Sequence, residues 1–216
     1  MEIRRFVMSP LRSNCYVVSE SLERGSPAVI VDPGDTYLDE VFAYVEEHGL
    51  RVVANWNTHA HFDHVVGVDL VRERYQCPSF VHVDDVEIWE RTPANTLRWI
   101  GKEVPPLRAP DGVLRDGDEL QLGSLKFTVW HTPGHSPGCV CFVSDTLAIT
   151  GDTLFKGTVG RTDLEESDPQ AMEDSLRRIL AWDDALQLYP GHGGDSTMLE
   201  EREKNRFLRI AARGGK

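Results

Sequence analysis

Residues 58–67 read THAHFDHVVG and place three histidines and one aspartate within six positions. The segment before them, RVVANWNT, is rich in β-branched residues and predicts a strand. His59 and His61 are two residues apart, and side chains with that spacing on an extended chain point the same way. Both imidazoles can therefore face one cation.

The second half of this stretch predicts the start of a helix. Asp63 and His64 open the segment DHVVGVDLVRERY, in which Val68, Val71 and Tyr75 recur at helical spacing. We expect Asp63 and His64 in the first turn of that helix, close to the two histidines at the strand end. A solvated loop that happens to be rich in histidine is the alternative. Adjacent polar groups of this kind are, however, costly to place without a partner.

Three further candidate ligands lie at glycine-rich turns later in the chain. His135 stands between two Pro-Gly pairs in TPGHSPG, Asp152 follows an apolar strand in AITGDTLF, and His192 lies between glycines in LYPGHGG. Each pattern alone is common, but Pro-Gly turns are stiff, and a rigid sheet can aim strand-end residues at one point. Together with the first cluster they offer five histidines and two aspartates as ligands.

The composition restricts the partners that this protein can have. The chain has 216 residues and a formal charge of −12, a balance that repels phosphate backbones and anionic lipid. No apolar run approaches the roughly 20 residues of a membrane helix, and the N-terminus lacks the apolar stretch of a secretory signal. The four cysteines show no CxxC spacing. We therefore expect a reduced, cytoplasmic protein that binds neither nucleic acid nor membranes, with its oligomeric state left open.

The hydrophobic pattern predicts two β-rich halves, each carrying helices, in one domain over residues 1–216. In the first half the strand-like runs CYVVS, PAVIVD, RVVANWNT and SFVHV alternate with helical segments, one of them over residues 36–49. From about residue 119 the runs LQL, LKFTVWHT, CVCFV and TLAIT predict an antiparallel meander, and LQLYP predicts a final strand.

Two helices in the second half are predicted by their capping residues. Asp168 followed by a proline is typical of a helix start, and Thr197 with Glu200 indicates a capping box for a charged C-terminal helix. Residues 92–117 instead hold four prolines and no clear period. We expect a loop-rich excursion there, with one helical turn around residues 97–100, and a role in shaping the substrate pocket.

The donor set is that of an open, catalytic metal site. A structural zinc site is closed by four ligands, and the seven candidates exceed that number. Imidazoles and carboxylates without cysteine suit zinc, iron or manganese. Two metals about 3.5–4 Å apart, bridged by a carboxylate and a hydroxide, would use all seven ligands. We expect two divalent metal ions, with zinc as the first choice and iron or manganese as alternatives.

The pattern resembles that of the metallo-β-lactamase superfamily. The match is an HxHxDH run followed in order by a histidine, an aspartate and a histidine, and it spans most of the chain. The resemblance implies an α/β fold, a four-layer αββα sandwich with the site at one edge of its two sheets. It also implies how the ligands divide between the metals: His59, His61 and His135 for one, Asp63, His64 and His192 for the other, and Asp152 as the bridge.

Within that superfamily the chain is similar to the glyoxalase II-like branch, hydroxyacylglutathione hydrolases that cleave thioesters. The similarity lies in GDTLFKGTVGRTD, in PGHGGDSTMLEEREKNRFL and in the structural turn that Asp32 opens with Pro-Gly. Relatives usually have Asn-Pro-Phe where this chain has Asn205-Arg206-Phe207, and the longer enzymes continue into a glutathione-binding helical extension. The resemblance is therefore to the short, single-domain bacterial type. It implies a small-molecule thioester substrate and leaves open whether that substrate is linked to glutathione.

The reaction expected on such a site is hydrolysis. A metal lowers the pKa of bound water from 15.7 to about 7, so hydroxide is available at neutral pH to attack a thioester carbonyl. Asp63 could orient that hydroxide as well as ligate, and Asp152 would bridge, so both are candidate catalytic residues. Arg161 in GRTD is the first candidate to hold a substrate carboxylate, because a guanidinium pairs with carboxylates in bidentate fashion. Lys156 is a weaker candidate, and a surface role for Arg161 is the alternative.

Two rival functions fit parts of the pattern. A persulfide dioxygenase would hold one iron on two histidines and a carboxylate, here His59, His135 and Asp152. Those enzymes usually carry Ala-Leu-Leu-Ile-Arg-Gly-Cys before GRTD, whereas this chain has TLFKGTV over residues 153–159, which favours the hydrolase. A metal-binding module without turnover is the second rival, and the intact ligand set argues against it. Other esters, lactones and phosphodiesters are further substrates that such a site could hydrolyse.

Overall fold

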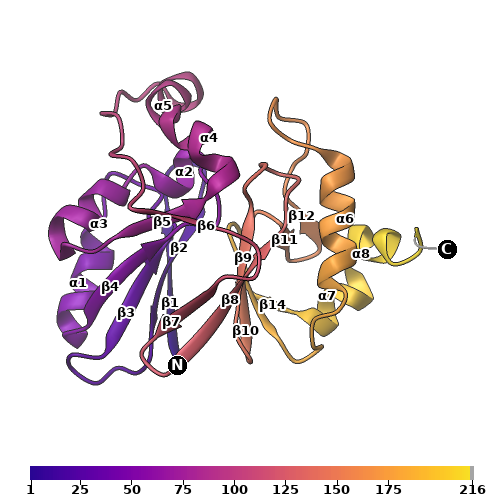
Figure 1. The fold of residues 1–216 in the computed structure, drawn as a ribbon, viewed down its shortest axis with the longest axis horizontal. Coiled ribbons are helices and arrows are strands. Elements are labelled where there is room, and N and C mark those ends of the chain that lie inside the picture. Colours follow the sequence, from indigo (N-terminus) through magenta and orange to yellow (C-terminus); the bar gives the residue numbers. More distant parts are fainter. Residues whose placement is uncertain (215–216) are drawn as a thin grey trace.

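The computed structural model describes residues 1–214 and has four layers (Figure 1). Two six-stranded sheets pack face to face, and helices cover both outer faces. This arrangement is the αββα sandwich that the resemblance implied. Each sheet, with the helices on its outer face, comes mainly from one half of the chain, so the site edge is formed where the two halves meet.

The first sheet mixes antiparallel and parallel pairing. In spatial order its strands are β1 (Glu2–Met8), β2 (Ser13–Ser19), β3 (Pro27–Val31), β4 (Arg51–Trp56), β5 (Ser79–His82) and β6 (Gly112–Leu114). The pairs β1–β2 and β2–β3 are antiparallel, and the pairs from β3 to β6 are parallel. The outer face of this sheet packs against α1 (Asp39–His48) and α3 (Val68–Tyr75). The strands β1 and β6 were not predicted.

The second sheet contains the predicted meander. In spatial order its strands are β14 (Ser196–Thr197), β13 (Gln187–Pro190), β10 (Leu147–Gly151), β9 (Val140–Val143), β8 (Leu125–His131) and β7 (Glu119–Leu122). Strands β7 to β10 pair antiparallel, as expected, and β13 lies parallel to β10. A short ribbon of β11 (Leu154–Phe155) and β12 (Thr158–Val159) follows β10. The outer face packs against α6 (Pro169–Ile179), α7 (Met198–Lys204) and α8 (Arg206–Ala211).

Alternation along the strands explains why two sheets stack with helices outside. On β2, Tyr16 and Val18 join the core between the sheets, whereas Cys15 and Val17 join the core under α1 and α3. Because the strand buries both faces, its sequence reads as a continuous apolar run rather than an alternating one. The four cysteines of the chain are all buried and free, so none belongs to a disulfide.

The candidate ligands leave the sheets at one edge. β4 leads directly into His59 and His61, and α2 (Phe62–Val65) begins immediately after them. In the second sheet β10 and β13 are parallel, so their carboxyl ends meet at the same edge and place Asp152 beside His192. The sheet order thus brings residues more than 100 positions apart in the sequence to one point.

The segment expected to be loop-rich is more regular than predicted. It contains all of α5 (Thr92–Ile100), which follows α4 (Val86–Glu90) and the 3₁₀ turn Val83–Asp85, and β6 lies near its end. The prediction of a single helical turn was wrong because Pro93 lies in the first turn of α5. A proline there removes no intrahelical hydrogen bond, and it therefore marks the start of the helix.

Two predicted helices are each divided. The helix expected from Asp63 breaks between α2 and α3, where Gly67 donates its N–H to the carbonyl of Pro33 at 2.9 Å. A Cβ at Gly67 would lie 2.2 Å from the Asp35 carbonyl oxygen, so only a glycine allows this close approach. The C-terminal helix breaks at Asn205, whose side chain caps α8. Within residues 1–214, no helix has the length and apolar character needed to cross a membrane.

Candidate metal centre

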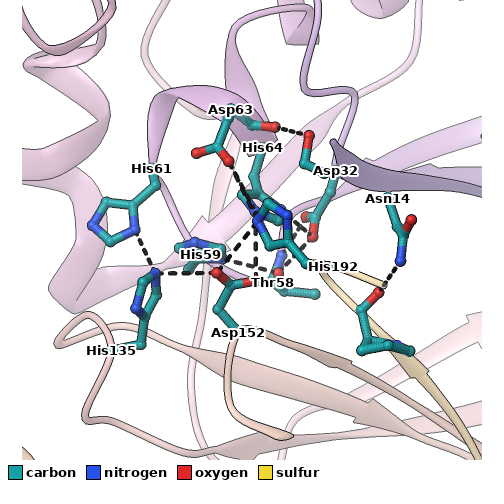
Figure 2. A network of polar contacts seen from close by, with 12 residues as sticks. Asn14, Asp32, Thr58, His59, His61, Asp63, His64, His135, Asp152 and His192 are labelled. Carbon is teal, nitrogen blue, oxygen red and sulfur yellow. Dashed lines mark hydrogen bonds and ion pairs between the residues drawn. The ribbon is translucent and has the colours of Figure 1, made fainter. Parts of the chain in front are cut away.

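The first candidate metal group consists of His59, His61 and His135 (Figure 2). His61 Nδ1 lies 2.8 Å from His135 Nε2, and His59 Nε2 is buried without a hydrogen-bond partner in the described part of the chain. The ligand atoms of the three residues all lie within 4.8 Å of one another. The ring nitrogens His59 Nε2, His61 Nδ1 and His135 Nε2 face one another, and at most one proton lies between the last two. The remaining lone pairs have no hydrogen-bond donor, which costs free energy in the interior. A cation among them would satisfy all three.

The second candidate group consists of Asp63, His64 and His192. His64 Nε2 lies 3.3 Å from His192 Nε2, and Asp63 Oδ2 lies 3.4 Å from His192 Nε2. Two of these residues are on α2, as the sequence predicted, and the third is on the loop after β13. Imidazoles combined with a carboxylate are a donor set for zinc, iron or manganese.

Asp152 lies between the two groups (Figure 2). Its Oδ2 is 3.3 Å from His135 Nε2, and its Oδ1 is 3.5 Å from His64 Nε2. Oδ1 is buried and accepts no hydrogen bond from residues 1–214. Oδ2 also lies 3.6 Å from His192 Nε2, so the carboxylate contacts both groups, as a bridging carboxylate needs. The donor set therefore fits two divalent cations, one in each group, that share Asp152.

Gly191 explains why a glycine precedes the last histidine. A Cβ at this position would lie 2.1 Å from Asp152 Oδ1 and 3.0 Å from His64 Cε1. Any side chain would therefore displace the bridging Asp152 and His64 of the second group. The glycines of LYPGHGG thus do more than form a turn, because this one gives the backbone room to approach the centre.

The histidines of the two groups differ in charge because burial and neighbouring carboxylates shift their pKa values in opposite directions. Burial lowers the pKa of His59 well below its usual value and that of His135 to about 4, so both rings are neutral and can donate lone pairs. Burial also disfavours charge on His64, but Asp63 and Asp152 beside it outweigh that effect and raise its pKa to about 10. The two carboxylates thus attract positive charge to the point where the second cation would lie.

Asp32 orients the second group from behind. Its Oδ2 lies 3.1 Å from His64 Nδ1, and its Oδ1 accepts a hydrogen bond from the backbone N–H of Thr58 at 2.7 Å. A carboxylate against Nδ1 favours the proton on that nitrogen and leaves Nε2 free to ligate. The sequence analysis assigned Asp32 only to a structural turn. The signal for its second role was a carboxylate at the end of β3, the strand beside β4.

Asp85 joins the two loops that carry the first group, and the sequence analysis missed it. Its Oδ2 accepts hydrogen bonds from the N–H of Ala60 and the hydroxyl of Ser136, both at 2.8 Å. Its Oδ1 accepts from the N–H of Gly138 at 2.6 Å. Ala60 separates the first two histidines, and Ser136 follows His135. One buried carboxylate therefore sets the distance between both loops.

Glu166 and a backbone carbonyl orient the other rings of the first group. Glu166 Oε1 lies 2.7 Å from His61 Nε2, and the Arg161 carbonyl oxygen lies 2.8 Å from His135 Nδ1. The hydrogen bond from His61 lowers the pKa of Glu166 to about 2. Each contact places the ring proton on the nitrogen that faces away from the centre. Nothing in the sequence around Glu166 distinguished it from the neighbouring acidic residues.

Replacing Glu166 with alanine should lower the affinity of the first group for its metal about tenfold, because partners of ligating histidines typically contribute that much. Titration against a chromogenic chelator measures the change. Glu165 is a matched control, since it is exposed and forms no hydrogen bond or ion pair within residues 1–214. If Glu165→Ala and Glu166→Ala bind metal equally well, the orienting role of Glu166 is wrong.

The centre forms part of the wall of a cavity of about 670 Å³. His61, Asp63, His135, Asp152 and His192 all line it. Figure 1 shows α4 and α5 rising above the first sheet, and the segment that precedes α6 rising above the second. Residues from both of these regions line the cavity, so the expectation that the segment after residue 92 shapes the pocket is confirmed for α5.

The two predicted substrate-binding cations are placed differently. Arg161 lines the cavity, but its side chain is exposed and forms a bidentate pair with Asp163, with distances of 2.7 and 2.9 Å. Lys156 does not line the cavity, and its Nζ lies 3.5 Å from Glu200 Oε2. The structure therefore brings all seven candidate ligands together, brings Arg161 to the cavity rim, and leaves Lys156 outside.

Comparison with known proteins places this geometry in a family. Residues 8–192 match the Metallo-beta-lactamase superfamily. The chain is 37% identical to the uncharacterized protein ML0493 of Mycobacterium leprae, with 96% of this chain and 99% of that one covered. It is 32% identical to the "Probable metallo-hydrolase YqgX" of Bacillus subtilis, with 96% and 98% covered, and 27% identical to the hydroxyacylglutathione hydrolase GloC of Haemophilus influenzae, with the same coverage.

Two solved structures agree with the chain over nearly their whole length. The B3 metallo-beta-lactamase BLEG-1 has a TM-score of 0.87 and 32% identity, with 96% of this chain and 99% of that one covered. TTHA1623, solved in a di-iron-bound form, has a TM-score of 0.84 and 34% identity, with 94% and 99% covered. The two donor groups and the di-iron relative support a dinuclear metal site. This chain belongs to the metallo-β-lactamase superfamily.

Proposed function

We propose that this protein is a dinuclear, metal-dependent hydrolase that cleaves a small-molecule thioester. One observation carries the proposal: two donor groups of three residues converge in the cavity wall, and the carboxylate of Asp152 contacts both. The similarity to GloC supports a thioester as the substrate, and so does the GDTLFKGTVGRTD motif. Zinc is the expected metal, and the di-iron form of TTHA1623 makes iron the first alternative.

The metal ligands and the apolar residues of the cavity have different roles in this reaction. Bound metals would polarise the thioester carbonyl and make a water molecule nucleophilic at neutral pH. Asp63 and Asp152 both line the cavity, and the Asp63 carboxylate can accept a hydrogen bond from the attacking water and orient it. A thiolate is a good leaving group, so the cavity needs no dedicated general acid. Phe62, Ile88 and Phe155 give the cavity apolar lining that limits access of competing water.

The TLFKGTV segment over residues 153–159 favours the hydrolase over a mononuclear iron dioxygenase, and the second donor group, which does not decide the question alone, supports the same choice. That reaction needs one metal on His59, His135 and Asp152, and it leaves the second group without a role. In this structure the second group is as fully assembled as the first, and Asp32 additionally orients His64. Hydrolysis uses both groups, so we favour it.

The proposal is tested with protein of known metal content and a panel of acyl-thioesters with and without glutathione, together with a lactone, a β-lactam and glutathione persulfide. We expect two metals per chain and thioester cleavage that chelation abolishes and divalent metal restores. The β-lactam is included because BLEG-1 is a β-lactamase. Oxygen uptake with the persulfide at one iron per chain would replace the proposal with the dioxygenase. If protein with two bound metals per chain cleaves none of the thioesters, the proposal is also rejected.

A further inference from the structure

Three guanidinium groups reach the cavity beside the metal centre. Arg91 and Arg98 come from the start and the last turn of α5, and Arg161 comes from the loop that follows β12. A substrate with a carboxylate would be held by whichever of these cations is free to form a bidentate pair. The contacts of each guanidinium within the protein distinguish them.

Two of the three cations already have carboxylate partners. Arg161 donates two hydrogen bonds to Asp163 in the bidentate geometry that a substrate carboxylate would need. Arg91 forms an ion pair with Glu87, one helical turn earlier. A substrate acid would have to displace these partners, so the net gain from binding to either residue would be small.

Arg98 has no such partner. Within residues 1–214 it forms no hydrogen bond or ion pair with any side chain. Its Cζ lies over the ring of Trp99, 5.6 Å from the ring centroid, and both residues line the cavity. An aromatic ring under a guanidinium restricts its position by a cation–π contact, while the N–H groups at its edge stay available to an acceptor. Trp99 is 51% exposed, so the ring also offers an open apolar face.

The charge distribution of the cavity favours an anion on this wall alone. The opposite wall carries Asp163, Glu165 and Glu166 and one cation, Arg161, which Asp163 already pairs, and the chain as a whole has a formal charge of −12. A carboxylate on the acidic wall would meet like charges, whereas beside α5 it would meet two cations, one of them unpaired. Asn95 lies one turn before Arg98, lines the same cavity, and adds an amide that can donate a hydrogen bond.

We propose that Arg98, positioned by Trp99, receives a carboxylate of the substrate, and that the natural substrate is therefore an anionic thioester whose acid group extends from the metal centre toward α5. This inference rests on the proposed thioesterase function. It assigns substrate selectivity to α5 rather than to Arg161 of the GRTD motif.

The kinetic test compares Arg98→Gln with Arg161→Gln and with Arg91→Gln, a matched control on the same helix. Each variant is assayed with a carboxylate-bearing thioester and with its neutral methyl ester. For Arg98→Gln we expect KM for the acid to rise about tenfold with little change in kcat, and the preference for the acid over the ester to disappear. Arg98→Lys should have a KM for the acid between those of wild type and Arg98→Gln, because lysine keeps the positive charge but cannot form a bidentate pair with a carboxylate. An acid preference that survives in Arg98→Gln but vanishes in Arg161→Gln overturns the proposal.

A binding measurement separates this inference from the proposed function. (Benzylthio)acetate, a carboxylate whose sulfur is a thioether, and its neutral amide contain no cleavable thioester. Both are titrated calorimetrically into metal-loaded wild type and metal-loaded Arg98→Gln. We expect the acid to bind wild type about tenfold more tightly than the amide, and the advantage to vanish in the variant. If wild type cleaves no thioester yet shows this pattern, the thioesterase proposal fails and the carboxylate subsite stands. Equal binding of acid and amide to wild type rejects the subsite.

Discussion

Replacing Asp152 with alanine is expected to lower kcat at least about 1,000-fold and to reduce the metal content below two ions per chain. Asp152 is the residue whose carboxylate contacts both donor groups, with Oδ2 at 3.3 Å from His135 Nε2 and Oδ1 at 3.5 Å from His64 Nε2. Its loss removes a ligand from both metals at once. The effect should therefore exceed the roughly 10- to 100-fold loss that follows removal of a partner outside the ligand shell.

Elemental analysis after equilibration with metal, together with thioesterase kinetics, measures both effects. Asp145→Ala is the control, because that aspartate is exposed in the turn before β10, the strand that leads to Asp152. A variant that still binds two metals and turns over normally would show that Asp152 does not bridge.

The candidate ligands could be predicted because each lies where a strand ends and a turn with its own signature begins. His135 lies between Pro-Gly pairs and His192 between glycines, and both patterns mark turns regardless of what the rest of the chain does. The meander of β7 to β10 was equally clear, because its strands are close in sequence and bounded by glycine and aspartate. Local signals were enough for these features.

Features that depend on distant neighbours were not predictable in the same way. Glu166 contacts a histidine 105 positions earlier, and its own segment is simply acidic. α5 was predicted only as one turn, because four prolines and the lack of a clear period favoured a loop over residues 92–117, although the first turn of a helix tolerates a proline. β1 is an edge strand with charged residues on its exposed face, so it lacks the apolar run that identified the central strands.

The second large effect is expected at Asp85, behind the two loops that carry the first group. Replacing Asp85 with alanine should lower the free energy of unfolding by about 2–4 kcal/mol, because the N–H groups of Ala60 and Gly138 and the hydroxyl of Ser136 lose their acceptors in the interior. Burial raises the pKa of this carboxyl, so removing its charge offsets part of the loss. Asp85→Asn keeps one acceptor oxygen, so its free energy of unfolding should lie between those of Asp85→Ala and wild type.

Urea denaturation of the metal-free proteins measures this loss without a contribution from bound metal, which would otherwise stabilise the folded state. Asp84→Ala is the matched control, since its side chain is 53% exposed and a change there should stay within about 0.5 kcal/mol. With metal restored, Asp85→Ala should also bind the first metal about tenfold more weakly, because the loops of His61 and His135 are no longer joined. A stability equal to that of Asp84→Ala would mean that the two loops hold their positions without this carboxylate.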